Sequence, residues 1–267
     1  MKPNMDILIF GGQSNMQGQS ERLSECETVE HAFEYRLLED RLIPLRNLVG
    51  ENIIYERCGG YPFEAGADLR VWLQEHVTGS SCFGNTNLVP EFCRAYIRET
   101  KTKVAAVHIA KGSTQIADWL PGTDGYAILK EKSLAAVQRV QREYKIGHVF
   151  FIWLQGESDA IAGNSRYDYK DKMRLLKDAL KTDVGIQRFG VIRVGRFMND
   201  DRDLEIMEAQ DAVCREDNDF LMLTRLASEL GGQPAYMNPH YGGHYNASGL
   251  ELLGKAAGSV LGAAAGK

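Results

Sequence analysis

The sequence of 267 residues contains no long hydrophobic run. Its apolar segments are about strand length, far short of the roughly 18 apolar residues that a membrane helix needs. The N-terminal stretch MKPNMDILIFGG carries Asp6 inside its apolar part, and no small-residue cleavage site follows it. We therefore expect no signal peptide and no membrane partner, and the composition predicts a soluble globular protein.

Cysteine is scarce and forms no pattern. The five cysteines are widely spaced and include no C-x-x-C pair: Cys26, Cys58, Cys82, Cys93 and Cys214. An odd set of this kind is typical of reduced, mostly buried thiols rather than of a disulfide framework or a zinc knuckle. We expect a cytoplasmic location.

The sequence also lacks a basic stripe. The formal net charge is -5, and acidic and basic residues are scattered along the chain. A nucleic acid partner requires a concentration of positive charge, so none is expected. No internal repeat and no low-complexity tract divides the chain, and we interpret residues 1–267 as a single domain.

Short apolar runs alternate with amphipathic stretches. The runs are rich in β-branched residues and predict buried parallel strands at Asp6–Phe10, Lys103–Ile109, His148–Leu154, Phe189–Val194 and Phe220–Thr224. The stretches predict helices at Leu88–Thr100, Ile128–Tyr144, Tyr167–Lys181, Leu204–Glu216 and Ser248–Ala264. This alternation indicates an α/β fold, a three-layer α/β/α sandwich around a five-stranded parallel sheet. The expected strand order is 2-1-3-4-5.

One segment, at about 21–87, has no clear period. It contains Gly59-Gly60 and Pro62, and we interpret it as an irregular insertion after the first strand, with room for a hairpin. Long connections of this kind are often functional. Arg57, Tyr61 and Trp72 are candidates for part of a ligand pocket.

Small, polar, glycine-bearing sequences follow the first three predicted strands. In open α/β sheets, ligands bind at the carboxyl ends of the strands. Those ends are followed by Gly11–Asn15, Lys111–Thr114 and Gln155–Asp159. His240 and His244 lie in a loop before the last predicted helix, where Ser248 and Glu251 have the spacing of a capping box.

Ser14 has two interpretations. It could cap a short helix after the Gly-Gly turn, or it could be a nucleophile at a helix N-terminus. A nucleophilic serine needs a base, and His244 is the candidate, although a lone histidine can also be structural. An acyl-transfer intermediate needs fixed hydrogen-bond donors for its oxyanion. The N–H groups of Ser14 and Gly112 and the amide of Gln155 could supply them; alternatively, Gln155 ties down a loop.

Four blocks in order resemble the SGNH hydrolase superfamily. They are GQSNM at Gly12–Met16, AKGST followed by ADW at Ala110–Trp119, WLQGESDA at Trp153–Ala160, and GHYNASGLELLG near the end. More narrowly, they are similar to the sialate O-acetylesterases and acetylxylan esterases of carbohydrate esterase family 6. The resemblance implies that Ser14 is the nucleophile, that His244 is the general base, and that Ser14, Gly112 and Gln155 form the oxyanion hole. It also implies a sugar site lined by Trp119, and we add Gln13, Asn15 and Tyr241 to the expected substrate pocket.

The sequence departs from that superfamily at one position. An aspartate commonly stands three residues before the catalytic histidine, and here Tyr241 occupies that place. Three explanations remain open: a Ser14/His244 dyad whose ring donates to a backbone carbonyl near Asn238 or Pro239, an acid supplied by Glu157 or Asp159, or a crippled enzyme. Glu157 and Asp159 also have a structural interpretation, as loop anchors.

Other motifs favour no metal and no cofactor. The His240-x-x-x-His244 spacing suits a helical metal pair, but Gly242-Gly243 makes a helix there improbable. The KGST sequence at Lys111 has Walker residues in the wrong order.

The sequence thus predicts an esterase that acts on an acetylated carbohydrate and needs no cofactor. Two other functions remain as alternatives. One is a non-catalytic carbohydrate-binding relative that has lost the acidic triad member. The other is a flavodoxin-like binder that cradles phosphate on GGQSN. The identity of the sugar and the oligomeric state stay open at this point.

Overall fold

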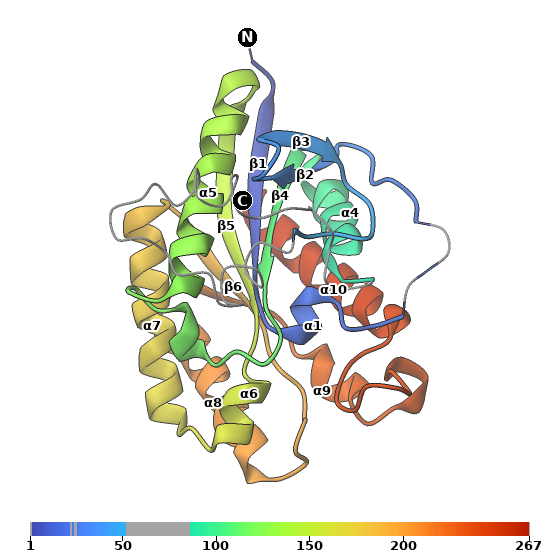
Figure 1. Cartoon of the computed structure of the whole chain (residues 1–267), viewed down its shortest axis with the longest axis vertical. Coiled ribbons are helices and arrows are strands. Elements are labelled where there is room, and N and C mark those ends of the chain that lie inside the picture. The colour runs from blue at the N-terminus through green and yellow to red at the C-terminus, as the bar shows by residue number, and fades with distance from the viewer. Residues whose placement is uncertain (1, 22, 24–25, 52–85, 267) are drawn as a thin grey trace.

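The computed structural model describes residues 2–21, 23, 26–51 and 86–266. Its core is a twisted sheet between two layers of helices (Figure 1). The strands are β1 (Asn4–Gly12), β2 (Ala32–Arg36), β3 (Arg41–Pro44), β4 (Lys103–Ala110), β5 (Lys145–Leu154), β6 (Arg188–Ile192) and β7 (Phe220–Thr224). The α-helices are α1 (Ser14–Gln17), α4 (Val89–Thr100), α5 (Asp124–Glu143), α6 (Glu157–Ala162), α7 (Arg166–Asp183), α8 (Asp201–Glu216), α9 (Leu226–Leu230) and α10 (Ala247–Ala265). Two 3₁₀ helices, η1 (Ile116–Trp119) and η2 (Pro234–Tyr236), lie in connections.

The sheet has the order β3-β2-β4-β1-β5-β6-β7. Its parallel part, β4-β1-β5-β6-β7, confirms the predicted order of the five apolar runs. β1 lies between β4 and β5, and its last residue, Gly12, is in register with Ala110 and Leu154. The carboxyl ends of these three strands therefore meet at one edge, which is the lower edge in Figure 1.

Helices cover both faces of the sheet. The connection from β1 to β4 runs in the opposite direction to those from β4 onward, so right-handed crossovers place α4 on one face and α5, α7 and α8 on the other. α10 follows β7 and packs against α4 (Figure 1). In the part of the chain that the structure describes, no helix combines the length and the apolarity needed to cross a membrane.

The sheet is wider than the sequence predicts. The first half of the irregular insertion forms a hairpin, in which β2 and β3 pair antiparallel and β2 pairs parallel with β4. The sheet thus has seven strands and is mixed at one edge, in place of five parallel strands. These two strands are short, and the charged residues Glu34, Arg36 and Arg41 interrupt their apolar pattern, which is why no period was visible.

Glycines let α10 approach α4 closely. Gly254, Gly258 and Gly262 recur every four residues and are buried on one face of α10. A methyl group at Gly258 would overlap the backbone carbonyl of Phe92 in α4. α10 begins directly after the loop that carries His244. The packing of α10 against α4 therefore fixes the position of the C-terminal end of that loop. The cap of α10 is Asn246, whose side chain accepts from the Gly249 N–H, and not the predicted Ser248.

A buried histidine supports α1. His108 in β4 lies beneath α1, and its Nε2 is 3.0 Å from the carbonyl oxygen of Met16. Burial, and then the positive charges of Lys132 and Arg36, lower the pKa of His108 to about 4, although the contact with Met16 opposes the shift. His108 is therefore neutral at neutral pH and donates to α1 from Nε2.

We predict that Gly258→Ala destabilises the protein. Alanine normally stabilises an exposed helix by about 1 kcal/mol relative to glycine, but overpacking costs about 1–3 kcal/mol. The free energy of unfolding in urea should therefore fall. Gly232→Ala, where a new methyl group would meet nothing within 4 Å, is the control and should change little. Equal effects of the two substitutions would contradict this packing.

We predict that acid weakens the protein through His108. The unfolded chain binds a proton on this histidine below pH 6.5, whereas the folded chain binds it only below about pH 4. Stability due to His108 is thus present above pH 6.5 and is lost as pH falls toward 4. The loss amounts to about 3 kcal/mol. In urea unfolding, His108→Gln should flatten the pH dependence between pH 7 and pH 4. Parallel curves for the two proteins would contradict the assignment.

Candidate active site

Ser14 lies at the point where β1 passes into α1. It is buried and is the first residue of α1, while the cap position is Gln13, whose side chain makes no capping hydrogen bond. The structure thus does not place Ser14 in the helix-capping role. Gly12 has φ +149°, and a side chain there would overlap the carbonyl of Leu154 in β5. Only glycine allows the chain to turn this closely against β5 and to present Ser14 at the sheet edge.

The amide of Gln13 faces the loop after β5. Its Oε1 accepts from the backbone N–H groups of Ser158 (3.2 Å) and Gly156 (3.4 Å) and from Nε2 of Gln155 (3.1 Å). Only 3% of Gln13 is exposed. Gln13 therefore anchors a loop, and its side chain does not line an open pocket as the sequence suggested.

Asn15 faces the loop that carries His244. Its Oδ1 accepts from the N–H of Tyr245 at 3.2 Å, and its Nδ2 donates to Oε1 of Glu157 at 2.8 Å. A longer contact of 3.5 Å joins Nδ2 to the carbonyl of Gly243. The Asn15 side chain is buried, as that of Gln13 is. Asn15 is therefore a structural element of the site rather than the expected substrate contact.

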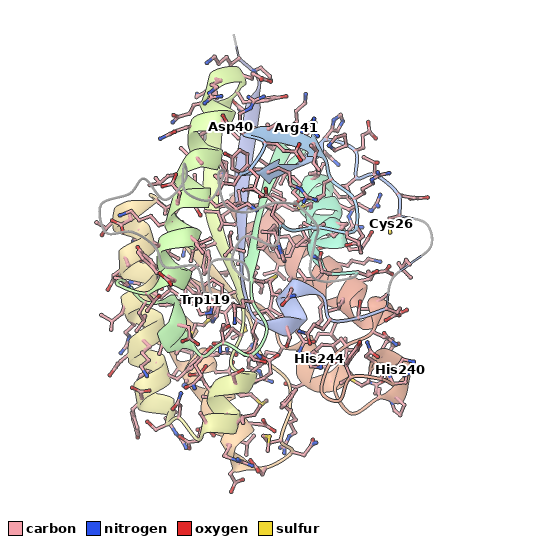
Figure 2. The ribbon with its side chains drawn as sticks, in the orientation of Figure 1. Cys26, Asp40, Arg41, Trp119, His240 and His244 are labelled. Atoms are coloured by element: carbon pink, nitrogen blue, oxygen red, sulfur yellow. The ribbon has the colours of Figure 1, made fainter. Side chains whose placement is uncertain are left out.

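The geometry around His244 fixes its ring. Nδ1 is 2.9 Å from the carbonyl oxygen of Gly242, so with the proton on Nδ1 the ring donates there and leaves the lone pair on Nε2 free. The ring also meets Phe197 edge-on, with centroids 6.2 Å apart. Figure 2 shows His244 below α1, at the end of the molecule where the parallel strands end. A backbone carbonyl was expected as the ring's partner, but it belongs to Gly242 and not to Asn238 or Pro239.

Tyr241 lies beside His244. The two rings meet edge-on with centroids 6.4 Å apart, and the Tyr241 carbonyl accepts from the His244 N–H. Tyr241 is 54% exposed, which suits a residue at the rim of a substrate pocket. It packs against the imidazole where an aspartate would have offered a carboxylate.

The two predicted oxyanion donors outside α1 are already engaged. The N–H of Gly112 donates to Oε1 of Gln17 at 2.8 Å. Nε2 of Gln155 has three acceptors. They are Oδ2 of Asp159 at 2.6 Å, the carbonyl of Thr114 at 2.8 Å and Oε1 of Gln13 at 3.1 Å. Gln155 is fully buried, so its amide does not fit the expected role of an oxyanion donor. It ties down a loop, the alternative that the sequence left open.

Asp159 is a loop anchor. Its oxygens accept from the Gln155 amide, from the N–H of Ile116 at 2.9 Å and from Nδ2 of Asn164 at 2.7 Å. Burial raises its pKa, although these hydrogen bonds oppose the shift. The carboxyl group thus joins the η1 segment to α6.

Glu157 is hydrogen-bonded to Asn15 and lies near His244. Its Oε1 accepts from Asn15, and its buried Oε2 has no hydrogen-bond partner among the described residues. Burial raises the pKa of Glu157, although the hydrogen bond from Asn15, a backbone hydrogen bond and the nearby His244 oppose the shift. Both features favour the neutral carboxyl group.

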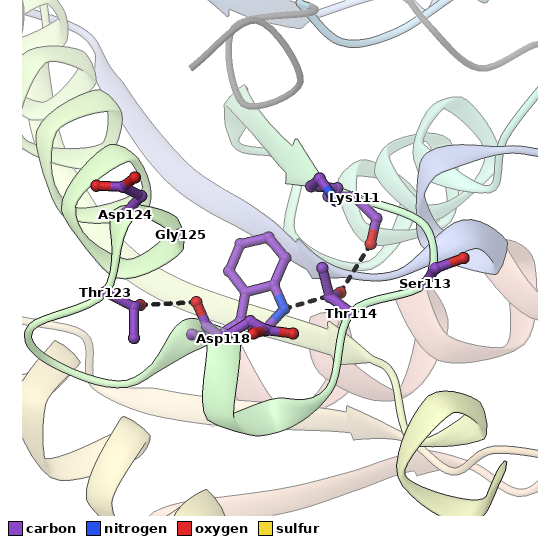
Figure 3. Close-up of a pocket in the computed structure, with 8 residues that line it drawn as sticks. Lys111, Ser113, Thr114, Asp118, Thr123, Asp124 and Gly125 are labelled. Carbon is purple, nitrogen blue, oxygen red and sulfur yellow. Dashed lines mark hydrogen bonds between the residues drawn. The ribbon is translucent and has the colours of Figure 1, made fainter. Parts of the chain in front are cut away.

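A cavity of about 260 Å³ lies beside the loop that follows β4. It is lined by residues of that loop, of η1 and of the start of α5 (Figure 3). The loop is joined to β1 by the hydrogen bond from the Lys111 N–H to the Gly12 carbonyl, two residues before Ser14. Side chains of Ser113, Asp118 and Thr123 give the wall hydroxyl and carboxylate groups. Such a wall suits a ligand rich in hydroxyl groups.

Trp119 supports this cavity from within. It is fully buried, its Nε1 donates to Oγ1 of Thr114 at 3.0 Å, and its ring meets Trp153 edge-on. Trp119 thus lines the cavity as expected, although its ring is buried and its indole N–H is engaged by Thr114. The other expected pocket residues, Arg57, Tyr61 and Trp72, lie outside the described residues.

Sequence reasoning missed Gln17. Positions 13, 15 and 17 all carry amides, and each amide oxygen accepts from a backbone N–H of a different loop. The alternation was visible in GQSNMQ, but nothing in the sequence named the partners. Among the described residues, no cluster of three or more His, Cys, Asp or Glu side chains could hold a metal ion.

Comparisons with known proteins show the family of the chain and its fold. A family model described as carbohydrate esterase, sialic acid-specific acetylesterase matches residues 67–255. No curated protein sequence matches the chain significantly. Among solved structures, one protein from Arabidopsis thaliana is similar with a TM-score of 0.62 and 16% identity, over 96% of this chain and 97% of that one. A novel carbohydrate acetylesterase from Xanthomonas citri is similar with a TM-score of 0.52 and 14% identity, over 97% of this chain and 55% of that one. At these identities the structural likenesses establish the fold.

Proposed function

The chain belongs to the carbohydrate esterase family of sialic acid-specific acetylesterases, and we propose that it hydrolyses O-acetyl esters of sugars with Ser14 as nucleophile and His244 as general base. One observation carries the proposal. Asn15, the residue after Ser14, binds the chain at Tyr245 and contacts it at Gly243, on both sides of His244. Residues that are 230 positions apart in the sequence are therefore neighbours at the sheet edge.

The first step forms an acetyl-enzyme. Oγ of Ser14 attacks the acetyl carbonyl carbon while Nε2 of His244 takes the hydroxyl proton. The bond between that carbon and the sugar oxygen then breaks, and the sugar oxygen receives the proton from His244. The Nδ1 hydrogen bond to the Gly242 carbonyl holds the tautomer that this step needs. In this mechanism a backbone carbonyl replaces the orienting acid.

The second step releases acetate. A water molecule gives a proton to His244 and attacks the acyl carbon, and the Ser14 oxygen leaves with that proton. Atoms and charges balance with water alone, so the proposed reaction requires no cofactor and no metal. The backbone N–H of Ser14 is a donor for the oxyanion of both tetrahedral intermediates.

The sugar is proposed to lie between Tyr241 and the cavity beside the Lys111–Thr114 loop. Tyr241 offers an exposed aromatic ring next to His244, and the cavity wall offers hydroxyl and carboxylate groups. These groups match the alternating apolar faces and hydroxyl groups of a sugar ring. An acetylated carbohydrate is therefore the substrate class we propose.

We predict acetate release from a panel of acetylated sugars, which includes acetylated xylose and O-acetylated sialic acid. Ser14→Ala and His244→Ala should each lower kcat by about 10⁴-fold or more, because nucleophile and base act as a unit. Ser248→Ala, at an exposed serine in the first turn of α10, is the matched control and should keep wild-type turnover. Sugar binding without acetate release by the wild type would instead support the non-catalytic alternative.

A further inference from the structure

We propose that Asn15 is a positioning residue that sets the place of His244, and that Glu157 acts on Asn15 as a hydrogen-bond acceptor and not on His244 as the acidic triad member. This inference rests on the proposed function, in which His244 is the base. It assigns a role to the residue after the nucleophile and removes the need for a carboxylate at position 241.

The first support is that Asn15 contacts the His244 loop at the residues directly before and after His244. Oδ1 accepts from the N–H that follows His244 directly, at Tyr245, and Nδ2 approaches the carbonyl that precedes it, at Gly243. Because Asn15 also follows Ser14 in α1, one short side chain spans from the nucleophile's helix to both flanks of the base. Any displacement of this amide moves His244 relative to Ser14.

The second support is the choice of side chain. The position requires an acceptor for Tyr245 and a donor for Glu157 at the same distance from the backbone. Asparagine supplies both; aspartate supplies only acceptors when ionised, and leucine supplies neither. The amide orientation is set by these partners, because the reverse orientation would place Nδ2 against the Tyr245 N–H.

The third support is the state of Glu157. The side chain is buried and its Oε1 is used by Asn15. The pKa of Glu157 is raised, mainly because burial disfavours its charged form. A neutral carboxyl group still accepts from Asn15 through its carbonyl oxygen, whereas a charged partner for His244 would have to remain ionised. His244 already has an acceptor for Nδ1 at Gly242.

The fourth support is that the side chains of Gln13 and Gln17 hold the loops after β5 and β4 in the same way. Gln13 accepts from the N–H groups of Gly156 and Ser158, and Gln17 accepts from the N–H of Gly112. Each of the three loops around Ser14 is thus fastened to the segment Gln13–Gln17 by an amide oxygen. Asn15 is the member of this set that fastens the base.

The test compares kcat and KM for acetate release in five variants. Asn15→Ala should lower kcat by about 10²-fold with KM within about three-fold, since a misplacement of about 1 Å costs this much while the sugar contacts stay. Glu157→Leu should resemble Asn15→Ala, and Glu157→Gln should recover most of the lost kcat, because glutamine keeps the acceptor oxygen. Asn246→Ala is the matched control: it removes the cap of α10 just beyond the loop, and should lower the melting temperature without changing kcat. Ser14→Ala should abolish turnover.

Two results would overturn the inference. If Glu157→Gln loses activity as fully as Glu157→Leu, the carboxylate charge is required and Glu157 is an acid for His244. If Asn15→Ala keeps wild-type kcat, or raises KM alone, Asn15 does not position the base. Should Asn15→Ala fail to fold, the Glu157 pair and its melting temperatures decide the matter. If Ser14→Ala leaves turnover intact, the proposed function fails and not merely this assignment.

Discussion

The hydrogen bonds that the Asn15 side chain makes between α1 and the loop of His244 are the contacts on which the site depends. β1 is a central strand, so its carboxyl end lies between the ends of β4 and β5. The loop between η2 and α10 reaches the same edge and is joined there to Asn15. Loops carry many unpaired backbone groups, and a buried unpaired N–H is costly. The amides at 13, 15 and 17 satisfy such groups in all three loops at once, which gives the site a single geometry.

Much of the fold follows from the sequence. The five apolar runs were buried parallel strands because both of their faces are covered by helices, and their order follows from the handedness of the crossovers. The sequence left room for a hairpin in the insertion, but the bounds of β2 and β3 and their place in the sheet were not predicted, because their alternation is broken by charged residues. Glu34 and Arg36 form a buried ion pair there. The cap of α10 was placed two residues late because Asn246 and Ser248 are equally good caps in isolation, and only the backbone decides between them.

The candidate site could be predicted at the level of residue type but not of partner. Ser14 and His244 were predicted to be neighbours because loops at the carboxyl ends of parallel strands converge, which is a property of topology. Gln155 was expected to be a donor for substrate because a buried amide needs partners; it has partners, but they are Gln13, Asp159 and Thr114. Trp119 was expected to line a sugar site; it does line the cavity, but its ring is buried and its Nε1 donates to Thr114. In both cases the sequence shows that a side chain needs a contact and cannot say which neighbour supplies it.

The central claim is that the Asn15 amide holds the chain next to His244. Residue-resolved hydrogen exchange by NMR, on the wild type and on Asn15→Ala, tests it most directly. The Tyr245 N–H donates to Asn15, so its exchange should accelerate about five-fold, as expected for the loss of a hydrogen bond of about 1 kcal/mol. The Gly112 N–H, which Gln17 holds, should exchange at the wild-type rate. Unchanged exchange at Tyr245, or equal acceleration at Gly112, would contradict the account.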